Sequence, residues 1–433
     1  MRTTGETPVS HEIHEGIPMK RMKKLAVVAC ATVALFGASM SFAAEKIRVF
    51  GCDEPVQSVK RGICANKLSA EDFKALAPGV SWFYNWHYKS DFLPPEGVKM
   101  EFLPMMWGDS EDRYKGLEEY LAAGHKPRAV LALNEPNLKG QAFIDPQRTA
   151  KSYLRTKAIA DKFNIPTVGP HMALGSAPKD SISADDPLEG KKVTYGNMMQ
   201  FLKPFLHYVG DDKLVGAIGV HAYGNGGELN WAANVLTKDF NKPIWMTEYA
   251  FWNAKNEAEE LRYLIESTDL LERSPHVHGY AWFKERVNGN PKISLFEKAS
   301  GKLTRIGEAY VALPVHDADV YYRIPGKLNA SRYVTMEKAQ IGPSNVPGEL
   351  FEMHGDGNGF CEYNIQVDQP GNYTVKLSAK GDGAIKFAGE SLNLTGKEFG
   401  VVEAKLNLKK GPQTLKLEFS KKGQAIASIE FTR

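Results

Sequence analysis

Short apolar runs alternate with longer amphipathic stretches over residues 60–312. The runs are typical of buried parallel strands, and apolar repeats at helical spacing in Arg148–Phe163 and Lys255–Arg273 are typical of helices packed on a sheet. Strands are predicted at eight places, near Lys60–Ala65, Val80–Trp86, Lys99–Met105, Ala129–Asn134, Pro166–Pro170, Val215–His221, Pro243–Glu248 and Val277–Phe283. Eight strands that alternate with helices over about 250 residues predict a TIM (β/α)8 barrel, an α/β fold.

The pattern changes beyond residue 314. Apolar and polar residues now alternate strictly, as in Cys361–Val367, and turn sequences such as Asp356–Gly359 separate the runs. This alternation is typical of antiparallel strands with one buried face. We therefore expect a barrel domain over residues 46–314 and a smaller antiparallel β-sandwich over residues 321–433.

The N-terminus carries a secretion signal. A basic cluster at Lys20–Lys24 precedes the apolar run Leu25–Phe36, and small residues follow near Ala43. This is the layout of a signal peptide over residues 19–43. Residues 1–18 do not fit that layout, and a start codon placed too early explains them.

We expect cleavage near Ala43 and Ala44 and a secreted or periplasmic protein. A lipoprotein signal that ends at Cys30 is the alternative. No later apolar segment reaches the ~18 residues of a membrane helix, so the mature form is expected to have no membrane contact.

Composition and charge exclude several classes of protein. Of the 433 residues 43% are hydrophobic, which suits a large buried core. The 54 Lys and Arg nearly balance the 51 Asp and Glu, so charge gives no reason to expect nucleic-acid binding. Cys52, Cys64 and Cys361 are too few for a disulfide framework, and whether Cys52 and Cys64 are bridged stays open. A monomer is expected.

Two carboxylates close apolar runs in the predicted barrel. Glu135 ends the fourth run and Glu248 ends the seventh. A carboxylate at the end of a buried strand costs folding free energy unless it is paired or has a function. Because active sites of TIM barrels lie at the carboxyl ends of the strands, Glu135 and Glu248 are the predicted catalytic pair.

Aromatic residues surround the same predicted mouth. His221 and Tyr223 end the sixth run, Trp282 ends the eighth, Trp86 ends the second, and Trp107 follows the third. Flat side chains stack on the apolar faces of sugar rings, so this rim predicts a polysaccharide or oligosaccharide substrate. No phosphate-binding loop, dinucleotide fingerprint or metal-ligand motif occurs, and no cofactor or metal is expected.

The ordered motifs of the first domain resemble glycoside hydrolase family 128, over about residues 59 to 312. The segments that carry the resemblance are Val80–Trp86, Phe102–Gly108, Leu133–Asn137, Val220–Gly224, Ile244–Tyr249 and Tyr280–Phe283. The resemblance implies a clan A barrel and a retaining endo-β-1,3-glucanase.

The resemblance also implies roles for single residues. Glu135 is implied as the acid/base, Glu248 as the nucleophile and Asn134 as the residue that binds the sugar 2-hydroxyl. Tyr249, which follows the nucleophile in its motif, joins the substrate-binding candidates. Asn137 departs from the family, which usually has Asp there. A retaining mechanism implies carboxyl groups ~5–5.5 Å apart.

The second domain resembles carbohydrate-binding module family 6. The matching segments are Tyr322–Leu328, Gly371–Val375 and Gly411–Leu417. The scaffold matches better than the binding residues, because other residues occupy the usual binding positions, namely Asn329, Ser331, Phe360, Ala425 and Ala427. Whether this domain binds sugar or calcium stays open.

The leading hypothesis is an exported retaining glycoside hydrolase that cleaves β-glucan, most simply β-1,3-glucan. Two alternatives stay open. One is a hydrolase of another β-linked polysaccharide, such as mannan or an algal glycan. The other is a non-catalytic glycan-binding protein, which would have no reason to keep both Glu135 and Glu248.

Overall fold

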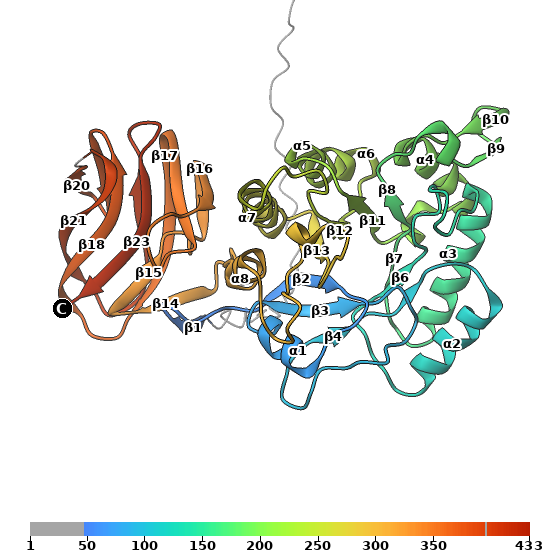
Figure 1. Cartoon of the computed structure of the whole chain (residues 1–433), viewed down its shortest axis with the longest axis horizontal. Helices are drawn as coiled ribbons and strands as arrows, with labels where there is room; N and C mark the ends of the chain where they lie inside the picture. The colour runs from blue at the N-terminus through green and yellow to red at the C-terminus, as the bar shows by residue number, and fades with distance from the viewer. Residues whose placement is uncertain (1–46, 395) are drawn as a thin grey trace, which may run out of the picture. The chain divides into compact units, whose positions relative to one another are not determined.

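Parallel strands and helices alternate along the first part of the chain, and antiparallel strands follow (Figure 1). The structure is a computed structural model, and it describes residues 47–394 and 396–433. The expected N-terminal extension over 1–18, the signal peptide over 19–43 and the cleavage site lie outside the described residues.

The strands of the first part lie where the apolar runs predicted them. They are β2 (Ser58–Cys64), β3 (Val80–Tyr84), β4 (Glu101–Phe102), β5 (Met105–Met106), β6 (Val130–Ala132), β7 (Thr167–Val168), β8 (His171–Ala173), β11 (Ile218–Ala222), β12 (Ile244–Tyr249) and β13 (Val277–Phe283). The eight predicted strand positions are therefore confirmed, whereas β8 and an antiparallel pair ahead of β11, β9 (Ser183–Asp186) and β10 (Lys191–Thr194), were not predicted.

All pairings among the ten strands β2–β8 and β11–β13 are parallel. One set pairs in the order β4-β3-β2-β13-β12-β11-β8, and a second set pairs as β5-β6-β7. Only Leu103 and Pro104 separate β4 from β5, and only Gly169 and Pro170 separate β7 from β8. Each interruption contains a proline, which cannot donate to a strand ladder. The pairings thus follow a nearly barrel-shaped circuit in which the first strand, β2, meets the last, β13.

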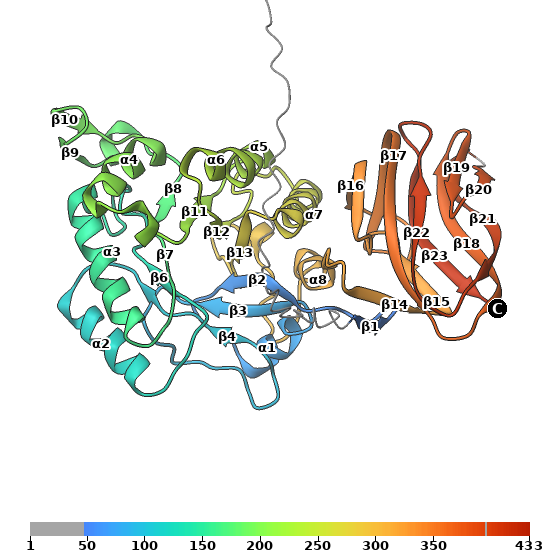
Figure 2. The ribbon, with the colours of Figure 1, turned by 180° about the vertical axis from the view of Figure 1, so that it is seen from behind.

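Helices lie along the outside of these strands (Figures 1 and 2). They are α1 (Ala70–Leu76), α2 (Glu111–Ala122), α3 (Pro146–Asp161), α4 (Met198–Val209), α5 (Gly226–Trp231), α6 (Thr237–Phe240), α7 (Glu257–Arg273) and α8 (Arg305–Ala312). Local sequence sets their starts: Asp145 caps α3 ahead of Pro146, and Asn256 caps α7. Within the described part of the chain, no helix is long and apolar enough to cross a membrane.

The C-terminal part is an antiparallel sheet, as the strict alternation predicted. Its strands are β14 (Val320–Ile324), β15 (Gly326–Asn329), β16 (Thr335–Pro343), β17 (Phe351–Val367), β18 (Gly371–Gly381), β19 (Ala384–Phe387), β20 (Glu390–Asn393), β21 (Gly396–Leu408), β22 (Gly411–Glu418) and β23 (Ala425–Thr432). The central order is β20-β19-β22-β17-β23-β18-β21.

One strand of this sheet comes from the other end of the described chain. Strand β1 (Arg48–Gly51) pairs in parallel with β14, and Arg48 lies opposite Val320. The chain therefore passes through the C-terminal sheet before it enters the first parallel strand. The alternation of residues did not reveal this pairing, because a four-residue strand carries too short a pattern.

Cys52, Cys64 and Cys361 are free and buried, so no disulfide joins Cys52 to Cys64. The thiol of Cys52 donates to the carbonyl of Arg323 at 3.1 Å, and that of Cys64 donates to the carbonyl of Trp282 at 3.1 Å. Burial raises the pKa of Cys52 to about 11. The two thiols therefore act as small buried donors.

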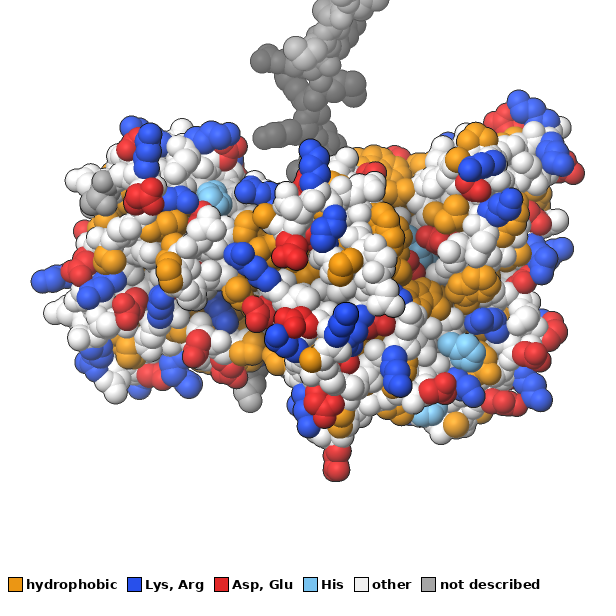
Figure 3. Space-filling view, viewed as in Figure 1, with side chains coloured by type: hydrophobic (Ala, Val, Ile, Leu, Met, Phe, Trp, Pro, Cys, Tyr) orange, Lys and Arg blue, Asp and Glu red, His pale blue; other side chains and the backbone are white. Residues whose placement is uncertain are grey.

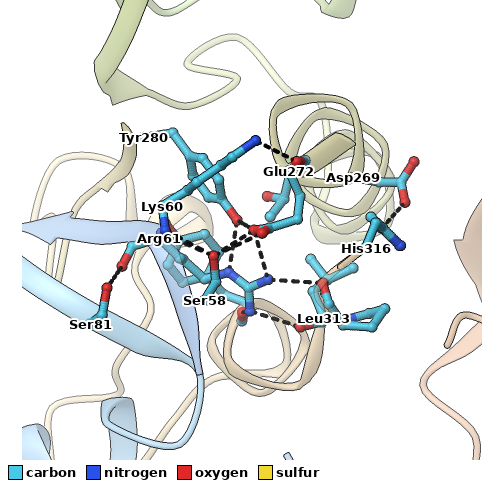
Figure 4. Close-up of polar contacts among 12 residues, drawn as sticks. Ser58, Lys60, Arg61, Ser81, Asp269, Glu272, Tyr280, Leu313 and His316 are labelled. Carbon is cyan, nitrogen blue, oxygen red and sulfur yellow. Dashed lines mark hydrogen bonds and ion pairs between the residues drawn. The ribbon is translucent and has the colours of Figure 1, made fainter. Parts of the chain in front are cut away.

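A buried arginine lies where β2 and β13 meet (Figure 4). Arg61 has no exposed surface, and its Nε donates to the hydroxyl of Tyr280 at 3.0 Å. Its Nη1 donates to the carbonyls of Tyr310 at 2.8 Å and Leu313 at 2.9 Å. The carboxylate of Glu272 on α7 lies 3.5 Å from Nη2. One guanidinium thus joins β2, β13, α7 and the segment that follows α8.

We expect Arg61→Met to destabilise the protein by ~3–5 kcal/mol, because it leaves the Glu272 carboxylate buried without its cationic partner. Denaturant unfolding followed by circular dichroism measures the loss. Adding Glu272→Met to Arg61→Met should recover part of the stability, since no buried charge then remains. As a control, Arg262→Met on the exposed face of α7 should cost less than ~1 kcal/mol. Equal losses for Arg61→Met and Arg262→Met would contradict this account.

Candidate active site

The two predicted catalytic carboxylates meet at the carboxyl ends of the parallel strands. Glu135 follows β6 and Glu248 lies on β12, and each is less than a tenth exposed, at 6% and 5%. His221 on β11 lies with them, and one ligand atom from each of the three residues falls within 4.8 Å of the others. Residues 113 positions apart in the chain therefore form one buried charged cluster.

The backbone has an unusual conformation at three residues in or next to the cleft. Glu135, Leu133 and Trp86 adopt left-handed conformations, with φ of 44°, 62° and 61°. Such conformations cost about 1–3 kcal/mol each for a non-glycine residue, and they persist only where the surroundings stabilise them. The amide of Glu135 donates to the carbonyl of His171 at 2.7 Å, which stabilises the turn.

Glu248 accepts three hydrogen bonds. The hydroxyl of Tyr84 donates to Oε1 at 3.0 Å, the indole Nε1 of Trp86 donates to the same oxygen at 2.7 Å, and the hydroxyl of Tyr223 donates to Oε2. Burial and the nearby carboxylate of Glu248 raise the pKa of both tyrosines well above the usual value, so both stay protonated donors. Three neutral donors therefore bond to the Glu248 carboxylate.

His221 lies between the carboxylates. Its Nδ1 is 2.9 Å from Oε1 of Glu135 and 3.5 Å from Oε2 of Glu248, and its Nε2 is 3.1 Å from the Thr247 hydroxyl. Burial alone would lower the pKa of His221, but Glu248 and Glu135 outweigh burial and raise it. Because both ring nitrogens already take part in hydrogen bonds, the cluster suits proton exchange better than metal binding.

A cleft of about 810 Å³ opens over these residues. On the face seen in Figure 3, hydrophobic side chains border a hollow in the parallel-sheet part. Of the residues predicted from the sequence, the cleft is lined by Glu135, Glu248, Asn134, His221, Tyr223, Trp86 and Trp107. The structure thus brings together the predicted pair and most of the predicted rim.

Trp282 and Tyr249 do not reach the cleft, and their prediction as substrate-binding residues is wrong. Both are fully buried, and their rings pack edge to face at 5.0 Å. The indole of Trp282 donates to the carbonyl of Ile293 at 2.7 Å, and the Tyr249 hydroxyl is 2.8 Å from that of Thr268 on α7. Trp282 faces the helices by the alternation of β13, and the register shift between Met246 and Tyr249 turns Tyr249 the same way.

Sequence reasoning missed several residues of the site. Phe283, Lys284 and Trp252 line the cleft, and Trp252 is 43% exposed. Tyr84 lies beneath it, bonded to Glu248. Alternation could have found two of them, because Tyr84 shares a strand face with Trp86, and Phe283 lies on the face opposite Trp282. Nothing in the sequence marked Trp252, which lies on a loop.

Two asparagines near Glu135 have different roles. Asn137 donates to the carbonyl of Ala173 at 2.8 Å and accepts from its amide at 3.2 Å. An amide side chain can make both bonds whereas an ionised Asp could only accept, which accounts for Asn at this position. Asn134 donates to Gln141 at 2.9 Å, and its Oδ1 has no partner among the described residues.

Comparison with known proteins agrees with this geometry. The family model described as "Glycosyl hydrolase catalytic core" matches residues 62–310. A family 128 subgroup II endo-β-1,3-glucanase from Pseudomonas viridiflava is 30% identical, with a TM-score of 0.51 over 60% of this chain and 100% of that chain. A subgroup II enzyme from Sorangium cellulosum is 27% identical, with a TM-score of 0.49 over the same shares. The comparison with curated proteins gives no match. The chain belongs to the glycosyl hydrolase catalytic core family and, by its likeness to the P. viridiflava enzyme, to glycoside hydrolase family 128.

Proposed function

We propose that this chain is an exported, retaining endo-β-1,3-glucanase. The observation that carries the proposal is the buried Glu135 and Glu248 pair at the floor of an open cleft. Carboxyl groups this close suit double displacement, because inverting enzymes need ~6.5–9.5 Å to seat a water between them. The activity of the P. viridiflava enzyme, named an endo-β-1,3-glucanase, supports the choice of linkage.

Hydrogen bonding supports the two proposed roles independently of the family resemblance. Glu248 accepts from two tyrosine hydroxyls and an indole, none of which gives up its proton at neutral pH. These fixed donors support Glu248 as the nucleophile. Glu135 makes the shorter contact with His221, at 2.9 Å against 3.5 Å for Glu248, and a neighbour that exchanges protons near neutral pH supports Glu135 as the acid/base.

The catalytic cycle follows from these roles. Glu248 attacks the anomeric carbon while Glu135 protonates the departing glycosidic oxygen, and a glycosyl-enzyme forms. Water then enters, Glu135 accepts its proton, and Glu248 is released with the original anomeric configuration restored.

Side chains of the cleft can hold a glucan chain. Asn134 lines the cleft beside Glu135, and its Oδ1, without a partner among the described residues, would accept a hydrogen bond from a sugar hydroxyl. Trp86, Trp107 and Trp252 line the same cleft, and their flat faces can stack on sugar rings. An open cleft with several such faces suits internal cleavage of a long chain.

The proposal includes the two-domain architecture, with a TIM barrel over 46–314 and a β-sandwich like carbohydrate-binding module family 6 over 321–433. Eight parallel strand positions around a nearly closed circuit support the barrel. In the C-terminal sheet Ser331, Ala425 and Ala427 are buried at positions where that module family usually binds sugar. The proposal therefore assigns turnover to the parallel-sheet part alone.

We expect the protein to release reducing ends from soluble β-1,3-glucan and to form the β-anomer first, because double displacement retains configuration. Reducing-sugar assays on β-1,3-glucan, mannan, xylan and algal glycans, with NMR of the first product, test this. An α-anomer as the first product would contradict retention. Turnover of mannan, xylan or an algal glycan without turnover of β-1,3-glucan would contradict the proposed β-1,3 linkage. Binding without turnover of any glycan would favour a glycan-binding protein.

We expect Glu248→Ala and Glu135→Ala to fail in different ways. Without Glu248 turnover should fall by about three orders of magnitude or more, and added azide should give a product of inverted configuration. Without Glu135 an activated aryl glycoside should still form the glycosyl-enzyme, and azide should give a retained product. Glu260→Ala, a buried carboxyl of α7 outside the cleft, is the control and should keep full turnover. If Glu248→Ala gave the retained azide product and Glu135→Ala the inverted one, the roles of Glu135 and Glu248 would be exchanged.

Export rests on the residues before Ala44, and we expect the protein recovered outside the cytoplasm of a bacterial host to begin at Ala44. Intact-mass measurement and N-terminal sequencing check this. Leu35→Arg places a charge in the apolar run and should leave the protein unprocessed. A lipid-modified N-terminus at Cys30 would establish the lipoprotein alternative.

A further inference from the structure

A chain of hydrogen bonds continues from Glu135 past His221 into the protein interior. Behind His221 lie Thr247 on β12 and His171 on β8, both fully buried and outside the cleft lining. Nδ1 of His171 is 2.7 Å from the Thr247 hydroxyl, and Nε2 is 3.2 Å from the carbonyl of Val168. The chain of contacts therefore runs from a backbone carbonyl to the acid/base carboxyl.

The carbonyl of Val168, at one end of this chain of contacts, determines which atom donates and which accepts in each hydrogen bond. A carbonyl oxygen only accepts, so Nε2 of His171 carries a hydrogen. His171 is neutral, because burial and the neighbouring His221 lower its pKa well below the usual value and no carboxylate bonds to it. Its Nδ1 must then accept from the Thr247 hydroxyl. That leaves the Thr247 oxygen to accept from Nε2 of His221.

One proton remains for the contact between His221 and Glu135. With Nε2 committed to Thr247, the Nδ1 to Oε1 contact of 2.9 Å holds a single proton, on either His221 or Glu135. Two adjacent carboxylates favour the imidazolium, which places the resting proton on His221. The titratable groups around it are Glu135 beyond β6, His171 on β8, Tyr223 beyond β11 and Glu248 on β12, with Tyr84 and Cys64 behind Glu248.

We infer that Thr247 and His171 are positioning residues that hold His221 in the one protonation geometry from which it can store the acid proton and pass it to Glu135. The inference deepens the proposed function and rests on it. Neither residue touches the cleft, so both act through His221.

Transfer of the proton from His221 is coupled to the loss of negative charge on Glu248. Glu248 forms a bond to the anomeric carbon, the glycosidic bond breaks, and its electron pair stays on the leaving oxygen. As the bond breaks, the stored proton moves from Nδ1 of His221 to Glu135 and from Glu135 to that oxygen, which leaves His221 neutral and Glu135 as a carboxylate ready to accept a proton from water. Neutralising Glu248, 3.5 Å from Nδ1, removes the charge that held the proton on His221. During hydrolysis a water proton returns by the reverse path as Glu248 regains its charge.

Thr247→Val keeps the shape of the side chain and removes the hydroxyl, so it tests the inference. For unactivated β-1,3-glucan we expect kcat to fall ~10–100-fold with KM nearly unchanged, while an aryl glycoside with a good leaving group loses less than ~3-fold. The alkaline limb of kcat/KM should move to lower pH by about one unit, because the imidazolium loses an acceptor for Nε2.

Two further variants separate positioning from packing. Thr247→Ser restores the hydroxyl and should recover most of the lost turnover. Thr156→Val removes a buried hydroxyl on α3 that donates to the Ser152 carbonyl at 3.0 Å. This variant should leave kcat unchanged for both substrates. If Thr247→Val slowed both substrates equally, with the pH profile unmoved, a purely structural role would replace our inference.

A measurement that needs no turnover separates failure of the inference from failure of the proposed function. In the ¹⁵N-histidine-labelled full chain at pH 7, we expect both ring nitrogens of His221 to be protonated and His171 to be neutral with its hydrogen on Nε2. His171→Asn and His221→Asn assign the signals. The opposite tautomer of His171, or a neutral His221, overturns the inference whatever the enzyme cleaves. If both histidines show the expected protonation states but the protein does not cleave β-glucan, only the proposed function is overturned.

Discussion

The arrangement of the parallel strands depends on one buried cation. Arg61 lies on the first parallel strand, and its partners come from the last strand, from α7 and from the carbonyls that end α8. A guanidinium without solvent is tolerated only when its donors are matched, and here hydroxyl, carbonyl and carboxylate oxygens surround it. The same contacts lie where β2 pairs with β13, so they fasten the first parallel strand to the last.

At the carboxyl ends of β6, β11 and β12 the constraint is negative charge. Two buried carboxylates within 4.8 Å would repel each other strongly, and the structure compensates with three neutral donors on Glu248 and one imidazole between the pair. The left-handed backbone at Glu135 and Trp86 adds a further cost. The packing of the surrounding strands holds both features in place.

The C-terminal sheet is joined to the parallel-sheet part by more than a linker. Strand β1 pairs with β14 before the chain enters β2. His316, in the segment after α8, has its Nε2 2.9 Å from Asp269 of α7, and Tyr333 donates to the same carboxylate. Asp269 is almost fully buried, and partners from both parts bond to it. These contacts make α7 a shared element, since Glu272 bonds to the parallel-sheet part and Asp269, three residues earlier, bonds to residues on both sides of the domain boundary.

The sequence by itself determined the positions of the parallel strands, the change to antiparallel strands and the two carboxylates that meet at the cleft. Each is a local pattern, since apolar runs, alternation and a carboxylate that ends a run are visible within a few residues. Alternation along β13 also places Trp282 on the face opposite Phe283, so the prediction for Trp282 overlooked a local pattern, whereas the orientation of Tyr249 depends on the register shift beside Glu248.

Only the tertiary structure decided the rest. The pairing shifts register near Glu248 on both neighbouring strands, and such irregularities re-aim a side chain that simple alternation would turn toward the helices. The pairing of β1 and the chain from His171 through Thr247 to His221 likewise join residues far apart in sequence. No local pattern encodes such contacts, because each exists only once the strands are packed side by side.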